Sequence, residues 1–161
     1  MSGARQVWVR TFRDGRVLVA GWDFPAAEPL VIVLSERLGL GHPGPLHHWC
    51  PVCGSIEHGR PQVTGGLELS IAHAAGGTAV AASLDGPVGV DVEVDADPAW
   101  VRREATAKAA GVGLVGGELP DPGWVADLDL PGRVGAVALV SEAAREAAVA
   151  GVRRARSRRG G

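Results

Sequence analysis

The sequence predicts an α+β protein, in which antiparallel strands and helices occupy separate stretches of the chain. Residues 88–94 alternate valine with glycine or a carboxylate, which is the period of a strand with one buried face. The chain continues with Asp97-Pro98, a typical helix start with aspartate as N-cap and proline at the first helical position. Asp14-Gly15 separates two apolar segments and indicates a β-hairpin.

The N-terminal elements are predicted from their turn and breaker residues. We expect the hairpin strands over Arg5–Phe12 and Arg16–Gly21. A short helix is expected over Leu30–Leu40, ending at a glycine. The next segment, Gly41–Gly66, is rich in glycine, proline and histidine, and we expect it to be loop.

The remaining elements are marked by alternation, caps and Gly/Pro-rich turns. Three strands in a meander are expected over Leu67–His73, Thr78–Leu84 and Val88–Val94. They are followed by a helix Pro98–Ala110, a link Gly111–Gly123, a strand Val134–Val140 and an alanine-rich helix capped by Ser141.

Composition sets limits on the class of protein. A length of 161 residues suits one compact domain or two small halves that share a core. No long apolar run and no N-terminal export signal are visible, so we expect no membrane span and a cytoplasmic location, where two cysteines stay reduced. The net charge of -2 gives no overall attraction to nucleic acid. The basic tail 151–161 is expected to be disordered or a frayed helix end, with an acidic partner as the less favoured alternative.

The segment that carries the strongest chemical signal is Val88–Lys108. On its strand, Asp91 and Glu93 lie side by side on the polar face, and such carboxylates repel unless a cation lies between them. A hard ion such as Mg²⁺ with a phosphate ligand would relieve that repulsion. Glu104 and Lys108 are four residues apart and share one face of the following helix.

Lys108 is the single lysine among 16 basic residues, and lysine, unlike arginine, can release its proton when its surroundings lower its pKa. The residues alone leave two interpretations open. They predict either a metal and proton-transfer site, or a solvated strand face beside a helix ion pair.

Three further positions have an ordinary explanation beside a functional one. Cys50 and Cys53 have the spacing of one zinc knuckle, whose other ligands would come from His47 or His48 and from His58. Because no second CxxC pair exists, two reduced thiols in a turn are the favoured interpretation and zinc the less favoured one.

His73 continues the apolar row of Leu67, Leu69 and Ile71, which predicts a partly buried core histidine. Arg60 lies between Gly59 and Pro61, in a segment where a solvated side chain is the ordinary expectation.

Taken together, these motifs resemble the 4′-phosphopantetheinyl transferase superfamily in its single-chain, surfactin-type branch. The matching segments occur in the family's order: Cys53-Gly54 with His58-Gly59-Arg60-Pro61, the strand Leu69–His73, Gly89-Val90-Asp91-Val92-Glu93, and Trp100–Lys108 followed by Gly111–Leu114. The combination of GxDxE with WxxxEAxxK is the specific part of this resemblance.

The resemblance implies a fold, an activity and a set of site residues. The fold would be two similar α+β halves, 1–85 and 86–161, with antiparallel sheets and the site between them. The activity would be transfer of the phosphopantetheine arm of coenzyme A to a serine of an acyl or peptidyl carrier protein. Asp91, Glu93 and Glu104 would hold Mg²⁺ with the coenzyme A pyrophosphate; Glu104 is also a candidate base, and Lys108 would protonate the leaving phosphate. Arg60 and His73 would contact coenzyme A phosphates.

Two departures from the family pattern support an alternative. Ala72 and Ala74 replace the two serines of the family's SHS element, and only Val94–Ala99 joins the GxDxE strand to the following helix. The alternative is a non-catalytic relative that binds coenzyme A or a carrier protein without transfer. A third hypothesis is a small zinc-knuckle interaction protein.

Overall fold

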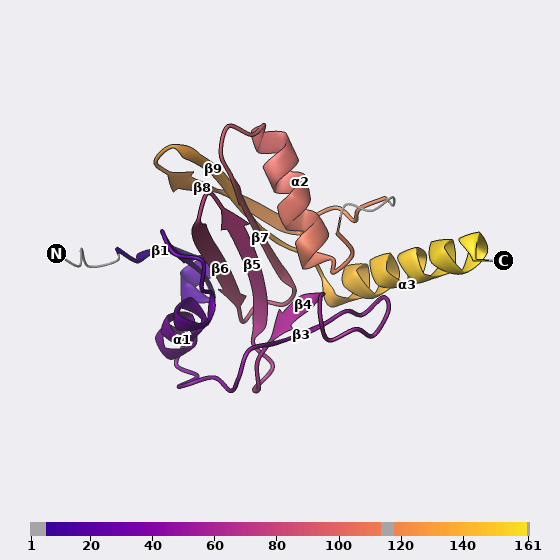
Figure 1. Cartoon of the computed structure of the whole chain (residues 1–161), viewed down its shortest axis with the longest axis horizontal. Helices are drawn as coiled ribbons and strands as arrows, with labels where there is room; N and C mark the ends of the chain where they lie inside the picture. Colours follow the sequence, from indigo (N-terminus) through magenta and orange to yellow (C-terminus); the bar gives the residue numbers. More distant parts are fainter. Residues whose placement is uncertain (1–5, 114–117, 161) are drawn as a thin grey trace.

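Apolar residues at alternating positions build two antiparallel sheets that pack face to face in the computed structural model (Figure 1). The structure describes residues 6–113 and 118–160. The first sheet has the order β1 (Trp8–Phe12), β2 (Val17–Trp22), β6 (Gly77–Ser83), β5 (Glu68–Ala74). The second has the order β7 (Val88–Glu93), β9 (Arg133–Leu139), β8 (Trp124–Leu130). The predicted α+β class with antiparallel sheets is confirmed.

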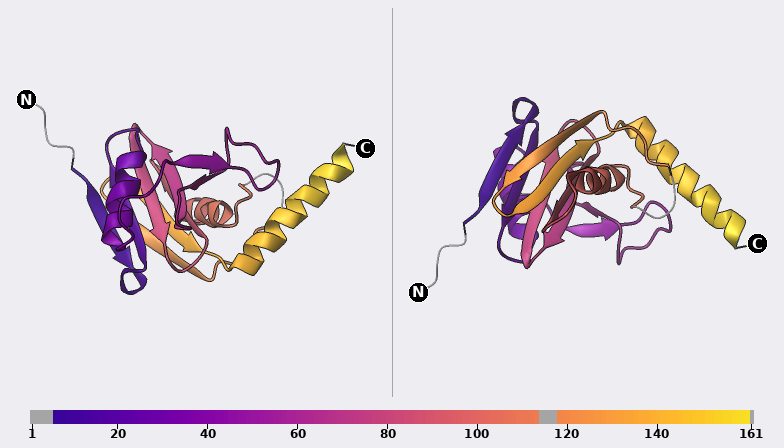
Figure 2. Two further views of the ribbon diagram at one scale, coloured as in Figure 1. Left: turned by 90° about the horizontal axis from the view of Figure 1, so that it is seen from below. Right: turned by 90° about the horizontal axis from the view of Figure 1, so that it is seen from above.

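Three helices and one small ribbon complete the fold. The helices are α1 (Glu28–Arg37), α2 (Pro98–Ala109) and α3 (Glu142–Arg159), and a 3₁₀ turn, η1, covers Arg13–Gly15. The ribbon pairs β3 (His47–Trp49) with β4 (Arg60–Gln62). Figure 2 shows α1 and α2 on opposite sides of the two sheets, and α3 extending away from them.

The core lies in three layers between these elements. Valines of both sheets, including Val19, Val90 and Val137, fill the space between the sheets. Leu30 and Leu34 of α1 cover the outer face of the first sheet. On the outer face of the second sheet, α2 packs with small residues onto small residues of β9. Each sheet is therefore buried on both faces, which explains the nearly continuous apolar character of β2, β6 and β9.

Close contact between α2 and β7 depends on Gly89. A Cβ at this position would collide with the carbonyl oxygen of Ala105 and lie 2.5 Å from the nitrogen of Ala109. The helix therefore rests directly on the strand. Asp91, two residues further along β7, lies on the same face and is covered by the helix as a result.

The predicted meander of three strands is wrong at its third strand. β5 and β6 are neighbours, but β7 pairs with β9 in the second sheet. Both edges of β6 are already occupied, by β2 and β5, so β7 finds no free edge there. It packs across the first sheet instead, and the Val90 N–H donates a hydrogen bond of 3.0 Å to Ser70 Oγ.

Other differences from the sequence predictions have local causes. The segment Gly41–Gly66, which was expected to be loop, contains the β3–β4 ribbon. Proline is tolerated on an edge strand, so Pro61 does not prevent this short pairing. The strand β8 was not predicted; its aspartates interrupt the apolar pattern. The basic tail is helical through Arg159, because α3 begins at a Ser141 N-cap that accepts a hydrogen bond from Ala144 N–H and continues through good helix formers.

The hairpin and the remaining predicted elements are confirmed with small shifts at their ends. Asp97 caps α2 by accepting a hydrogen bond of 2.9 Å from the Ala99 N–H. Arg5, part of the link Gly111–Gly123 and Leu114 of the quoted motif lie outside the described residues.

Candidate functional site

The ion pair between Lys108 and Asp91 joins α2 to β7. Lys108 Nζ, in the last turn of the helix, lies 2.8 Å from Asp91 Oδ1. The Asp91 side chain is 6% exposed, and its Oδ2 is buried with no hydrogen-bond partner among residues 6–113 and 118–160. A buried carboxylate oxygen without a partner is unfavourable, so this atom is a natural position for a cation or a donor from a ligand.

Glu104 lies one helical turn before Lys108 and interacts with the same group. Burial raises the pKa of Glu104 above its ordinary value, the Asp91 and Glu93 carboxylates raise this pKa further, and Lys108 opposes them. Asp91, Glu93 and Glu104 therefore lie within electrostatic reach of one another, and we call these three residues the carboxylate cluster. The sequence placed Glu104 and Lys108 on one helix face and left an ion pair between them as one interpretation, whereas the ion pair that forms runs from Lys108 to Asp91.

The donor atoms of the carboxylate cluster are of the type that binds Mg²⁺. Hard oxygen atoms are the ligands Mg²⁺ prefers, and the unpartnered Asp91 Oδ2 offers one of them. The three side chains do not bring one oxygen each within 4.8 Å of one another; in the described part of the chain, only Cys50, Cys53 and His58 bring three ligand atoms that close together. Glu93 and Glu104 are only partly buried, so rotation of their side chains can close this gap.

A cavity of about 300 Å³ opens beside Lys108. Strands β4 and β5, the loop between β3 and β4, the C-terminal end of α2 and the helix α3 all contribute to its wall. Three of the lining side chains are cationic: Arg60, Lys108 and Arg156. Ser70 and the backbone of residues 111–113 add polar groups. A cavity with this lining favours an anionic ligand, and Lys108 connects it to the carboxylate cluster.

Arg60 is held in the cavity wall by a network of charges. Its Nη1 lies 3.3 Å from Glu68 Oε2, and its Nε is buried with no partner among the residues that the structure describes. Glu68 also accepts hydrogen bonds of 2.9 and 3.0 Å from Arg145 of α3. Burial raises the pKa of Glu68, Arg60 lowers it and Glu142 raises it. The ordinary expectation for Arg60, a freely solvated side chain, is therefore wrong.

His73 lies away from this cavity. It is exposed at the end of β5, its Nδ1 lies 3.0 Å from Thr78 Oγ1, and it is not among the described residues that line the cavity. The predicted partial burial of His73 is wrong, because the apolar row that it continues is covered only further back along the strand, where Leu67 and Leu69 are buried.

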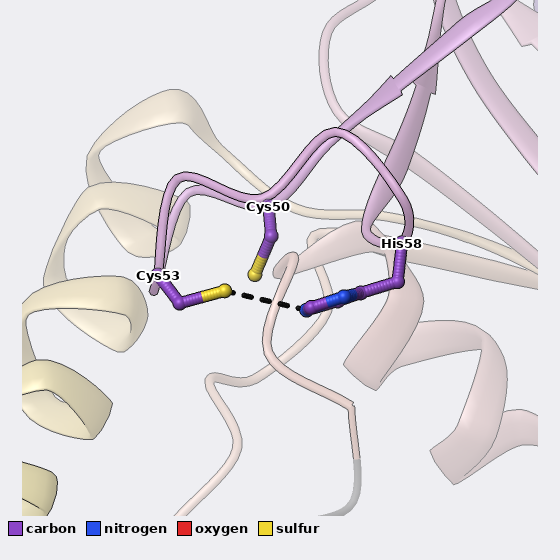
Figure 3. A group of neighbouring side chains, drawn as sticks. All are labelled: Cys50, Cys53 and His58. Atoms are coloured by element: carbon purple, nitrogen blue, oxygen red, sulfur yellow. Dashed lines mark hydrogen bonds between the residues drawn. The ribbon is translucent and has the colours of Figure 1, made fainter.

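The segment 50–59, which we call the cysteine loop, brings two thiols and an imidazole together (Figure 3). Cys53 Sγ lies 3.3 Å from His58 Nε2. Burial raises the pKa of the Cys50 thiol, but hydrogen bonds from the Cys53 and Val52 backbone and from the Cys53 and His58 side chains outweigh it and lower the pKa to about 7. Both cysteines are free thiols.

Sequence reasoning missed part of the cavity wall. Arg156 belongs to the tail that was expected to be disordered or a frayed helix end. It lines the cavity because α3 runs past β5 and the cysteine loop, where Arg145 contacts Glu68 and Arg153 contacts Pro51. The only sequence signal was the excess of arginine over residues 151–161. Ser70 was visible within the strand motif, but its partner in β7 was not.

No protein-family model matches this chain, and no curated protein matches it either. Within the described residues, no helix combines the length and the apolar character that crossing a membrane requires. The functional interpretation therefore depends on the residues and their geometry.

Proposed function

We propose that this chain is a Mg²⁺-dependent transferase that moves the 4′-phosphopantetheine arm of coenzyme A to a serine of an acyl or peptidyl carrier protein. The observation that carries the proposal is the buried Asp91, whose one oxygen meets Lys108 while the other has no partner in residues 6–113 and 118–160. The motif pattern and the cationic cavity beside Lys108 support it. The two-half fold of this superfamily is part of the same proposal.

Mg²⁺ would be held by Asp91, Glu93 and Glu104. When bound, it supplies positive charge against the pyrophosphate of coenzyme A. The unpartnered Asp91 Oδ2 is the group that most needs this charge. Mutual repulsion within the carboxylate cluster would decrease at the same time. Burial, together with that repulsion, raises the pKa of Glu104 above its ordinary value.

The remaining steps use side chains of this chain. Arg60 and Arg156 would hold phosphate groups in the cavity, in place of the His73 contact that the resemblance implies. Glu104, whose pKa is raised by burial and by the nearby carboxylates, would accept the proton of the carrier serine. A new bond would form from the serine oxygen to the β-phosphorus, the P–O bond to the α-phosphate would break, and Lys108 would protonate the departing 3′,5′-ADP.

The position of the cavity also agrees with this reaction. Its wall combines β4 and β5 from the part of the chain before Asp85 with α2 and α3 from the part after it. An extended substrate such as coenzyme A could therefore contact both parts of the chain at once.

The test is incubation of the full chain with an apo carrier protein, coenzyme A and Mg²⁺, followed by mass spectrometry of the carrier. We expect the carrier to gain the mass of one phosphopantetheine arm. Asp91→Asn and Lys108→Ala should each lower the rate at least about 100-fold, because each removes charge stabilisation at the reacting phosphate. Asp95→Asn is the matched control: Asp95 is exposed near the same strand end, and asparagine tolerates its positive φ of 54°.

Unmodified carriers across fatty-acid, polyketide and peptide synthesis types would refute the transfer reaction. Coenzyme A binding that needs Asp91 and Mg²⁺, without any transfer, would instead support the non-catalytic alternative. The two outcomes are separated by calorimetry on the same protein preparation.

A further inference from the structure

The cysteine loop has the geometry of a metal site that the proposed transfer reaction does not use. Cys50, Cys53 and His58 each offer one ligand atom, and these atoms all lie within 4.8 Å of one another. Figure 3 shows both sulfur atoms and the imidazole pointing toward a common centre. Cys50 is 8% exposed, whereas Cys53 and His58 are exposed, so an ion could enter from solvent.

The separation of these atoms agrees with tetrahedral coordination. Bond lengths of about 2.3 Å to sulfur and about 2.1 Å to nitrogen place the two ligand atoms roughly 3.6 Å apart at a tetrahedral angle. The observed distance from Cys53 Sγ to His58 Nε2 is 3.3 Å. A small outward movement of the exposed Cys53 or His58 side chain would therefore admit the ion.

Backbone hydrogen bonds hold Cys50 in a tight turn. The Cys50 N–H donates to the Ser55 carbonyl, and the Gly54 N–H donates to the Cys50 carbonyl, each at 2.8 Å. Hydrogen bonds next to a metal ligand fix its orientation, so these two bonds hold Cys50 in place for coordination.

Three features hold the loop in this shape. The β3–β4 pairing joins its two ends, with Trp49 opposite Arg60. Gly59 has φ of +109°, and a Cβ there would lie 2.5 Å from the Cys50 backbone, so the glycine allows His58 to approach the cysteines. Arg153 of α3 donates a hydrogen bond to the carbonyl of Pro51.

We propose that Cys50, Cys53 and His58 bind Zn²⁺ as three protein ligands and leave its fourth coordination position open at the edge of the cavity. Two thiolates and one imidazole are a donor set that suits zinc. Within the described part of the chain, neither His47 nor His48 joins the cluster, so the four-ligand knuckle considered from the sequence does not form. Cys50 and His58 also line the cavity that contains Arg60 and Lys108, so the open position faces the region where an anionic ligand or water is favoured.

The zinc site is tested on the full chain purified under reducing conditions from zinc-supplemented medium. We expect about one zinc per chain by elemental analysis. Cobalt exchanged into the site should show thiolate charge-transfer bands and the intense d–d bands of a tetrahedral ion. Added imidazole should change the d–d bands because it can occupy the open fourth position; an unchanged spectrum would overturn that position.

Cys53→Ser and His58→Gln are the informative variants, since both side chains are exposed and neither change is expected to prevent folding. Each should weaken zinc binding by more than the about 10- to 100-fold that loss of an outer-shell partner costs. His47→Gln is the matched control, an exposed histidine on β3 outside the cluster, and it should retain full zinc.

Three results would overturn the inference: zinc-free protein that does not bind added zinc with its thiols reduced, a different metal in stoichiometric amount, or equal loss of zinc in His47→Gln. None of these depends on transfer activity, so the zinc site and the proposed reaction can fail independently. Far-UV circular dichroism of each variant verifies that lost zinc is not lost folding.

Discussion

The carboxylate cluster and the cysteine loop are held by different parts of the fold. The cluster lies on β7 and α2, whose contact is fixed by Gly89 and by the buried small residues beneath the helix. The cysteine loop lies between two three-residue strands and has one buried ligand, Cys50. The first arrangement is determined by the packing of the whole domain, whereas the second depends on local hydrogen bonds and, in our proposal, on a bound ion.

The chemistry of the two sites differs in the same way. The cluster presents hard oxygen ligands that repel one another, and Lys108 forms an ion pair with only one of these oxygens, Asp91 Oδ1. The loop presents soft ligands that already lie at coordination distance from one another. Rigid elements can keep a repulsive group of charges together because many buried contacts oppose the repulsion, and a short loop cannot.

The largest effect is expected from a methyl group at the contact between α2 and β7. Gly89→Ala should destabilise the protein by about 3 kcal/mol or more, because the new Cβ collides with the backbone of α2 rather than with a movable side chain. Denaturant unfolding measures this. Gly151→Ala is the matched control: the same change in the exposed helix α3, with Arg154 3.9 Å away, should instead stabilise by about 0.5–1 kcal/mol.

If Gly89→Ala were tolerated with unchanged stability, the cluster would not depend on close packing and the contrast with the cysteine loop would fail. A partial loss confined to α2, seen by hydrogen exchange, would show that helix and sheet unfold separately.

Removal of zinc should have the next largest effect. Saturation with zinc at one hundred times its dissociation constant should stabilise the folded state by about 2.7 kcal/mol, provided that the unfolded chain does not bind it. Thermal unfolding with and without a zinc-selective chelator measures this difference. Cys53→Ser should abolish it, while Asp91→Asn should leave it unchanged because Asp91 belongs to the other site.

The smallest effect is expected from Mg²⁺ at the carboxylate cluster, and it should depend on pH. Burial, Asp91 and Glu93 raise the pKa of Glu104 from 4.5 against the opposing effect of Lys108, so the folded chain keeps this proton when the unfolded chain has lost it. Stability contributed by Glu104 is therefore lost as pH rises from 4.5 through the raised pKa. Mg²⁺ should restore about 1.4 kcal/mol near pH 7.5 at ten times its dissociation constant, and less as the pH falls through that window.

Glu104→Gln should remove this pH dependence and most of the Mg²⁺ effect, while Glu146→Gln, on the exposed side of α3, should change neither. Asp85 provides a contrast of opposite sign. Hydrogen bonds from Arg13 and Arg16 lower its pKa from 3.8, so its contribution is present above that value and is lost as pH falls through the lowered pKa. If Asp85→Asn and Glu104→Gln change the pH dependence of stability in the same direction, one of the two assignments is wrong.

Much of the fold followed from local patterns. The alternation over 88–94, the Asp97-Pro98 cap and the Ser141 cap predicted β7, α2 and the start of α3, because these signals act over a few residues. The β3–β4 ribbon and β8 did not follow, since their pairing energy comes from partner strands and not from their own composition.

The candidate site was predicted to a similar degree. The sequence placed Asp91, Glu93, Glu104 and Lys108 on one strand–helix unit. It left a Glu104–Lys108 helix ion pair open as one interpretation, and it did not predict the bond from Lys108 to Asp91 on the strand. For the cysteines it favoured two thiols in a turn. The approach of His58 depends on β3 pairing with β4 and on the left-handed backbone of Gly59, which are long-range and conformational facts.

By itself, the sequence determined the α+β class, the main strands and helices, and the identity of the residues at the Val88–Lys108 segment, because hydrophobic period and capping are local. Only the tertiary structure decided which strands share a sheet, which oxygen of Asp91 remains without a partner in the described chain, and that Arg60, Lys108 and Arg156 surround one cavity. These features depend on how separate elements pack, and the free energy of that packing is a property of the assembled fold rather than of any one segment.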